Sequence, residues 1–157
     1  MAYRVMDVAR YVINVCNKNG YGITNLRLQK ILYFIQVDFL TNLGKPCFDE
    51  DIEAWNFGPV IPEVYHEFKC YGNSKIPLVR RYIENETNIW DSQIRYFDYK
   101  KLDKEDRRRI EDIIRQCERY TTSELVEITH NQTPWVQAYK RRYDNIITRD
   151  SLVRYFK

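Results

Sequence analysis

The stretch N-L-R-L-Q-K-I-L-Y-F-I-Q-V-D-F-L-T-N-L, from Asn25 to Leu43, is the most apolar segment of this 157-residue sequence. Wound as a helix, it carries one face formed by Leu28, Ile31, Leu32, Ile35, Phe39 and Leu43, and further apolar residues spread around the rest. A helix that is apolar nearly all round is buried on several sides. Thr24 precedes it as an N-cap, and Gly44-Lys45-Pro46 follows as a stop. The stretch therefore predicts the central, buried helix of the fold.

The flanking segments predict further elements around this helix. Apolar residues from Val5 to Cys16 recur at helical spacing, which indicates an amphipathic helix over residues 3–18. Residues 47–57 alternate in character and predict a short strand or an extended arm. Gly58-Pro59 breaks this arm, and Pro62 begins a third helix, where a missing N–H costs nothing, that ends at Gly72.

Residues 73–100 allow two interpretations. The runs L-V-R-R-Y-I (78–83) and S-Q-I-R-Y-F (92–97), separated by E-N-E-T-N-I-W-D, have the composition of two short strands. They form either a β-hairpin or a loosely ordered excursion from the helical body.

The last third of the chain returns to helical patterns. Asp103 is the N-cap of a helix that runs to about Tyr120, and Thr121 with Glu124 forms a capping box for a short helix through Thr129. Pro134 opens a helix that includes residues 135–143, and Thr148 caps a last one over residues 149–156. We predict a mainly α fold: one compact multi-helix domain over residues 1–157, with a central buried helix and, under the first interpretation above, a small β-hairpin.

Composition limits the class of protein. The net charge is only +3, which is too mild to indicate a nucleic-acid partner by itself. The sequence contains neither an apolar run long enough to span a membrane nor a signal-peptide pattern at its start, so we expect a cytoplasmic protein. Four cysteines are spread singly, which predicts reduced and mostly buried thiols. Aromatic residues are frequent, and the 13 tyrosines suit half-buried positions and interfaces.

Reactive residue types are few. His66 and Cys70 share a helix face, but an exposed histidine beside a half-buried cysteine is far commoner than a catalytic pair. His130 follows a helix directly, where its imidazole can bind a terminal carbonyl and favour the negative end of the helix dipole, or contact a partner. Phosphate-binding loops, nucleophile elbows and metal-binding patterns are absent from the sequence, so we predict no enzyme activity, no metal and no cofactor.

Two clusters of charged residues could serve as binding sites. Asp49-Glu50-Asp51 with Glu53 lacks the glycine and the final glutamate of a calcium loop, and is read as a solvated acidic patch. A basic cluster, Lys100-Lys101, Lys104 and Arg107-Arg108-Arg109, resembles a nucleic-acid grip. Consecutive arginines on a helix fan out by about 100° each, and four acids interleave with them, so we do not expect this cluster to bind a nucleic acid.

Three blocks in this order resemble one family. They are I-T-N-L-R-L-Q-K-I-L-Y-F-I-Q (Ile23–Gln36), G-K-P-C-F-D-E-D-I-E-A-W-N-F-G-P-V-I-P-E-V-Y-H-E-F-K-C-Y-G (Gly44–Gly72) and S-E-L-V-E-I-T-H-N-Q-T-P-W-V-Q-A (Ser123–Ala138). Together they resemble the Panacea domain, also known as the SocA-like family, which includes phage-associated GepA-type proteins. The closing residues 147–156 fit as well. Residues 77–100 do not match the family pattern, and an appended DNA-binding domain is not expected.

The resemblance implies a mainly helical antitoxin, encoded by a bacterium or a phage. Its implied partner is a cognate toxin protein from a neighbouring gene, which it neutralises by direct binding. In some members the toxin is also delivered to an energy-dependent AAA+ protease. The family has no agreed catalytic residues. The alternatives are a nucleic-acid-binding regulator of phage or prophage origin, and an enzyme that uses His66, Cys70 or His130.

The matching motifs supply the candidate site residues. One interpretation assigns them to the fold, with Trp55 and Trp135 in the core, Gly58-Pro59 setting a turn, and Pro134 opening a helix. The other assigns partner binding to aromatic and polar residues at the rim, because aromatics surrounded by polar groups suit interface anchors. These partner-binding candidates are Phe57, Tyr65, His66, Tyr71 and His130.

Overall fold

A computed structural model describes residues 1–84, 90 and 92–157 of the chain. In chain order its elements are α1 (Val5–Lys18), α2 (Asn25–Asp38), the π-helical turn η1 (Phe39–Leu43), β1 (Ile52–Trp55), β2 (Gly58–Val60), α3 (Pro62–Phe68), the 3-10 turn η2 (Lys69–Tyr71), β3 (Arg81–Glu84), β4 (Gln93–Tyr96), the 3-10 turn η4 (Tyr99–Lys101), α4 (Lys104–Cys117), α5 (Thr122–His130), α6 (Thr133–Lys140), β5 (Ile146–Ile147) and α7 (Arg149–Phe156). The expected mainly α fold is confirmed.

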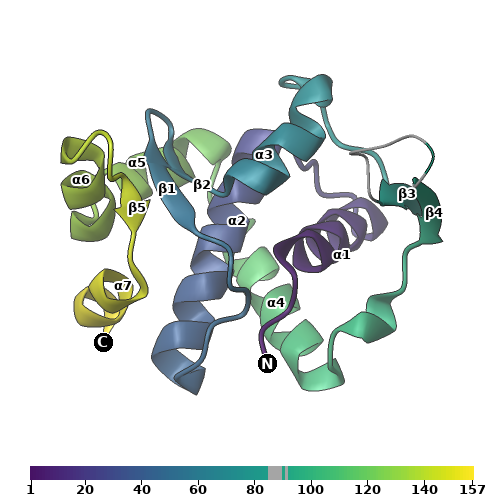
Figure 1. Ribbon diagram of the computed structural model, residues 1–157, viewed down its shortest axis with the longest axis horizontal. Helices are drawn as coiled ribbons and strands as arrows, with labels where there is room; N and C mark the ends of the chain where they lie inside the picture. Colours follow the sequence, from purple (N-terminus) through teal and green to yellow (C-terminus); the bar gives the residue numbers. More distant parts are fainter. Residues whose placement is uncertain (85–89, 91) are drawn as a thin grey trace.

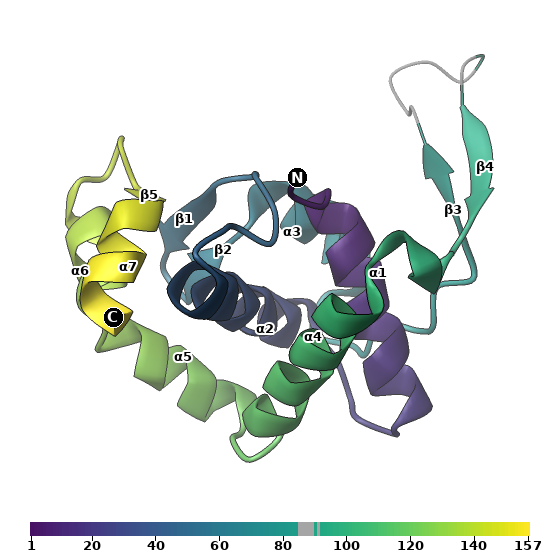
Figure 2. The same cartoon turned by 90° about the horizontal axis from the view of Figure 1, so that it is seen from below.

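Helix α2 lies at the centre of the molecule, and α1, α3, α4, α5, α7 and β2 all contact it (Figures 1 and 2). Its first turn is capped as predicted, because the Thr24 hydroxyl accepts a hydrogen bond from the Arg27 amide at 3.2 Å. The helical path continues through η1 and ends at Gly44, whose φ of +67° is left-handed. The predicted helix over residues 25–43 is therefore present as an α-helix followed by a π-helical turn.

A three-stranded antiparallel sheet in the order β2-β1-β5 packs beside this centre. Trp55 in β1 pairs with Gly58 in β2, so Asn56 and Phe57 form a tight two-residue turn between the strands. Only part of the predicted extended arm is a strand, and the sequence did not indicate β2 or β5. Strands of two or three residues are too short to show an alternating pattern.

The second sheet is the hairpin β3-β4, in which Ile83 pairs with Ile94 and Tyr82 with Arg95. The hairpin interpretation of residues 73–100 is thus confirmed for its two strands. Most of the segment between them, residues 84–91, lies outside the described residues. Figure 2 shows the hairpin projecting from the helical body beyond α1.

Several helices end earlier than their sequence patterns predict. α3 gives way to η2 before Gly72, α4 ends at Cys117 before Tyr120, and α6 ends at Lys140 before Tyr143. In the last case Arg142 adopts a φ of +56°, which no α-helix accommodates. Apolar spacing alone does not locate a helix end, since the last turn is decided by local hydrogen bonding.

The caps give a mixed outcome. The capping box of Thr121 and Glu124 is confirmed, with both reciprocal hydrogen bonds present. Asp103 does precede α4, but its side chain makes no capping hydrogen bond. Its amide instead donates to the Tyr3 hydroxyl at 3.1 Å, so this helix start is tied to the N-terminal segment.

A candidate protein-binding site around the β1–β2 turn

The β1–β2 turn places an aromatic side chain at the surface. Phe57, at the tip, is 64% exposed, although a residue with an aromatic ring of this size is usually buried. Trp55, two residues before it, is half-buried, and Gly58, which follows it, is buried. The turn is therefore fixed at its base and open at its tip.

Three side chains from the α5–α6 region bind this turn, two at its backbone and one at the Asn56 side chain. The Trp135 indole N–H donates to the Trp55 carbonyl at 3.0 Å. His130 Nε2 lies 2.9 Å from the Asn56 carbonyl oxygen, and the Tyr139 hydroxyl donates to the Asn56 side-chain oxygen. The three rings pack on one another, with centroids 4.3 Å apart for His130 and Trp135 and 4.7 Å apart for Trp135 and Tyr139.

Helix α3 supplies a second aromatic group on the other side of the turn. The Trp55 and Tyr65 rings meet edge to face with centroids 5.1 Å apart, and Tyr65 meets His66 at 5.6 Å. His66 is exposed and Tyr65 is half-buried. We call Phe57, Tyr65, His66 and His130 together the turn surface, because they surround the β1–β2 turn.

A buried lysine lies beneath this turn. Lys30 of α2 is 0% exposed, and its ammonium nitrogen donates to the Pro59 carbonyl at 2.9 Å. A Cβ atom on Gly58 would lie 2.7 Å from Lys30 Cε and 2.9 Å from the Thr129 hydroxyl, and the φ of Gly58 is +106°. Burial lowers the pKa of Lys30 to about 7, because the charged form loses hydration.

Other polar residues of α2 bind the segments packed around it. Gln29 accepts from the Ile61 amide at 2.8 Å, and Gln36 donates to the Phe48 carbonyl and accepts from the Cys47 amide, both at 2.8 Å. The Tyr33 hydroxyl donates to the Gln132 side chain at 2.7 Å. The hydrogen bonds of Gln29 and Gln36 satisfy backbone groups that would otherwise be buried without partners. The three sequence blocks therefore meet at α2, the turn and the α5–α6 junction.

Sequence reasoning missed the polar side of α2. It described the helix by its apolar residues and gave no role to Gln29, Lys30 or Gln36, which are 1%, 0% and 2% exposed. The available signal was the presence of long polar side chains in a helix that had to be buried all round. Such residues need partners, which in this fold are carbonyls and amides of irregular segments.

The predicted site residues are only partly brought together. The rings of Tyr65 and His66 are in contact, and Phe57 and His130 lie at the same turn. Tyr71, in η2, is exposed, and the described residues record no ring contact between it and the others. Whether any of them binds a partner remains a prediction.

The structural interpretation of the motif residues needs two corrections. Trp55 and Trp135 are half-buried and do not fill the core: Trp135 packs against its edge, and Trp55 is not part of it. His130 binds the carbonyl of Asn56 in the turn, and not a carbonyl at a helix end. Gly58-Pro59 follows the turn as the start of β2, and Pro134 lies in the first turn of α6.

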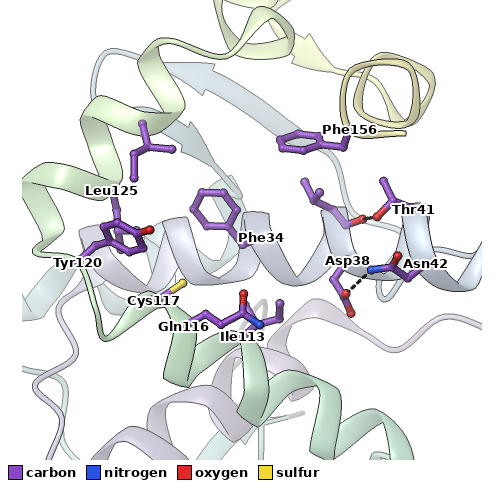
Figure 3. A pocket seen from close by; sticks show the side chains of 12 residues that line it. Phe34, Asp38, Thr41, Asn42, Ile113, Gln116, Cys117, Tyr120, Leu125 and Phe156 are labelled. Carbon is purple, nitrogen blue, oxygen red and sulfur yellow. Dashed lines mark hydrogen bonds between the residues drawn. The ribbon is translucent and has the colours of Figure 1, made fainter.

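An apolar hollow beside α2 lies elsewhere, between α2, α4, α5 and α7 (Figure 3). It has a volume of about 440 Å³, and its apolar lining comprises Phe34, Val37, Ile113, Leu125, Ile128 and Phe156. Asp38 at its rim is already paired with Arg109 at 3.0 Å and accepts from Asn42 at 2.7 Å. None of the predicted site residues lines this groove.

The charged clusters are largely built into the fold. In the acidic cluster, Asp49 pairs with Arg149 at 2.9 Å, and Glu50 accepts from the Val5 amide at the start of α1. In the basic cluster, the Arg107 guanidinium lies 4.9 Å from the centre of the Tyr99 ring, and Arg109 pairs with Asp38. The acidic cluster is therefore not simply solvated, and the basic cluster is not a continuous surface for phosphates.

The described residues add little reactive chemistry. All four cysteines are free, with Cys16, Cys47 and Cys117 buried and Cys70 exposed. In the part of the chain that the structure describes, no cluster of three or more histidine, cysteine and carboxylate side chains is arranged to hold a metal ion. Over the same residues no helix has the length and apolar character to cross a bilayer. An exposed aromatic turn on a rigid base is suited to contact with another protein.

Comparisons with known proteins identify the family of this chain. The family described as "Antitoxin SocA-like, Panacea domain" matches residues 28–136, which contain α2 from Leu28 onward, the turn and the α5–α6 junction. Antitoxin SocA of Caulobacter vibrioides (strain NA1000 / CB15N) is 34% identical over 131 residues, which cover 82% of this chain and 66% of that protein. No solved structure matches the chain. The family match covers more than half of the chain. The chain therefore belongs to the SocA-like antitoxin family, the family of the Panacea domain.

Proposed function

We propose that this chain is an antitoxin that neutralises a cognate toxin by binding it directly through the turn surface, without catalysis. The toxin is a protein, encoded by a gene next to that of this chain. The proposal rests on family membership and on the printed role of the relative, an antitoxin. Its site rests on Phe57, which is 64% exposed on a rigid turn.

The physical argument for the turn surface is preorganisation. Three side chains fix the turn through the Trp55 carbonyl and both Asn56 oxygens. The backbone that carries Phe57 is therefore ordered before binding, so a partner needs to order only the ring, at a cost of about 0.5–1.5 kcal/mol. Aromatic anchors with polar groups around them dominate the energy of many protein interfaces.

Masking and delivery to a protease are two ways in which a bound antitoxin can act. We propose masking as the principal mode, in which the toxin accumulates in an inactive complex. An adaptor for a AAA+ protease would instead lower the amount of toxin in the cell, and this loss would vanish in a strain without the protease. Immunoblots of the toxin with and without this chain separate the two modes.

The first test is co-expression with the product of the neighbouring gene. We expect that product to arrest growth, this chain to relieve the arrest, and the two proteins to co-purify. Replacement of Phe57 by Ala should raise the Kd of the complex by about tenfold or more, as expected for an interface anchor. Isothermal titration calorimetry with the purified toxin measures the change.

Tyr155→Ala provides the matched control. Tyr155 lies in α7, is 45% exposed and is also aromatic, but it is not part of the turn surface. Its replacement should leave the Kd unchanged. Equal effects of the two substitutions would show that the turn surface has no special role, and a neighbour that never binds this chain would contradict the proposed function as a whole.

A further inference from the structure

The β3-β4 hairpin is anchored to the body by one of its faces. Tyr82 is 9% exposed, and the Arg10 guanidinium carbon of α1 lies 3.4 Å from the centre of its ring. Lys101 donates to the Tyr82 hydroxyl at 3.2 Å. Glu84, on the same face, pairs with Arg4 at 3.1 Å and with Arg95 at 2.8 Å. This inner face holds the hairpin in a fixed position.

The outer face has no comparable role within the described chain. Directly paired residues of antiparallel strands share a face, so Ile83 and Ile94 lie together, and the pair Arg81 and Tyr96 lies beside them. Ile83, Ile94 and Tyr96 are 53%, 60% and 72% exposed. A two-stranded hairpin is marginally stable alone, and an exposed strand with apolar side chains invites association. We call these four residues the hairpin face.

Charge argues against a second copy of this chain as the occupant of the hairpin face. Arg81 lies in the face, Arg80 precedes it, and both are exposed, while no described residue forms an ion pair with either. Two such faces would bring like charges together. Pairing two four-residue edges would also bury far less than the roughly 1,200 Å² of a stable interface. An apolar surface with an acidic rim is the complementary partner.

Position links this face to the turn surface. Along the long axis of the molecule, α3 lies between the β1–β2 turn and the hairpin in both views (Figures 1 and 2). α3 carries Tyr65 and His66, and η2 after it carries the exposed Tyr71. A partner on the turn surface that extends along this axis past α3 would reach the hairpin.

We propose that the hairpin face is a second contact for the same toxin, and that it docks on an apolar patch of the toxin bordered by acidic residues. This inference rests on the proposed function and extends it to a part of the chain with no assigned role. The two isoleucines supply apolar contact. Arg81 steers the acidic rim, and steering changes the association rate more than the dissociation rate.

The test measures toxin binding by full-length variants. Ile83→Thr combined with Ile94→Thr keeps β-branched residues in the strands while it removes apolar contact. We expect this double variant to raise the Kd for the neighbour-encoded toxin about tenfold, with an unchanged melting temperature. Arg81→Glu should lower the association rate severalfold at low salt, and the difference should shrink as salt is added. Stopped-flow fluorescence measures both rates.

Leu43→Thr provides the control, because Leu43 is 38% exposed at the end of η1, away from the hairpin, and should bind as the wild type does. Wild-type affinity of the double variant would overturn the second contact and leave the proposed function intact. A dimer of the unbound wild type, lost in the double variant by analytical ultracentrifugation, would assign the face to a second copy and also overturn it. Absence of any toxin binding by the wild type would instead contradict the proposed function.

Discussion

Lys30 occupies a position in which a charged side chain is costly. Its amine is fully buried, and the Pro59 carbonyl is the hydrogen-bond acceptor recorded for it. No described carboxylate pairs with it, and burial accounts for the lowering of its pKa to about 7. The lysine therefore ties α2 to the strand after the turn and makes stability depend on pH.

The pH dependence has a definite sign. The unfolded chain holds the lysine proton up to a pKa of about 10.5, whereas the folded chain releases it near 7, so between these values the unfolded state binds more protons. The contribution of Lys30 to the free energy of unfolding should therefore rise as pH increases above 7, by up to about 1.4 kcal/mol per pH unit. Below pH 6 this contribution should stay level. Urea denaturation of the wild type and Lys30→Met at pH 6, 7.5 and 8.5 measures the difference. A constant difference across this range would contradict the lowered pKa.

The upper limit of the measurements, pH 8.5, lies below the pKa of about 9 of an unfolded cysteine thiol. Burial raises the pKa of the Cys16 thiol to about 12, and this stabilising contribution is lost only as pH rises above the unfolded value of about 9. The partial ionisation of the unfolded Cys16 thiol near pH 8.5 is common to the wild type and Lys30→Met, so the change in their difference with pH belongs to Lys30.

Gly58 closes the site over Lys30. Its φ of +106° disfavours any side chain, and a Cβ would meet Lys30 and Thr129 at less than 3 Å. Gly58→Ala should lower the unfolding free energy by about 2–4 kcal/mol, from backbone strain and crowding together. Gly20→Ala is the control, since Gly20 also has a positive φ, +73°, but open space around it, and should cost about 1–2 kcal/mol. Chemical denaturation at pH 7 compares them, and equal losses would show that crowding does not matter.

At the scale of elements, the β1–β2 turn depends on helices far along the chain. Trp135 and His130 bind its carbonyls, and Trp135 lies 80 residues from the Trp55 whose carbonyl it contacts. In the sequence these residues lie in separate motifs, and nothing in the sequence predicts that they are in contact. The reason is that a tight turn leaves carbonyls without strand partners, and the α5–α6 junction supplies the donors.

Trp135→Phe tests this dependence. The ring is kept and the indole N–H is lost, so the unfolding free energy should fall by about 0.5–1.5 kcal/mol and toxin affinity should weaken with it. Trp55→Phe is the comparison, because its N–H binds Glu53 two residues away in the same strand, at 2.9 Å. Hydrogen exchange of the turn amides should accelerate more in Trp135→Phe. The same exchange rates in both variants would argue against support of the turn by α6.

At the scale of the whole molecule, the chain presents two exposed apolar regions, the turn surface and the hairpin face. Along the long axis, α3 lies between them. The turn surface and the hairpin face both lie within residues 28–136, the range that matches the family, so the expectation that residues 77–100 depart from the family pattern is not confirmed. The helical core supports both, since α1 anchors the hairpin and α2 anchors the turn.

The sequence by itself determined the central helix, the main helical elements and the motif residues, because these depend on apolar spacing, caps and glycines that act over a few residues. It could not determine the short strands β2 and β5, the helix ends, or the half-buried positions of Trp55 and Trp135. Only the tertiary structure decided that Lys30 lies under Gly58, that His130 and Trp135 hold the turn, and that one face of the hairpin stays open. These are contacts between residues far apart in the chain, and no local propensity encodes which polar group will find which partner.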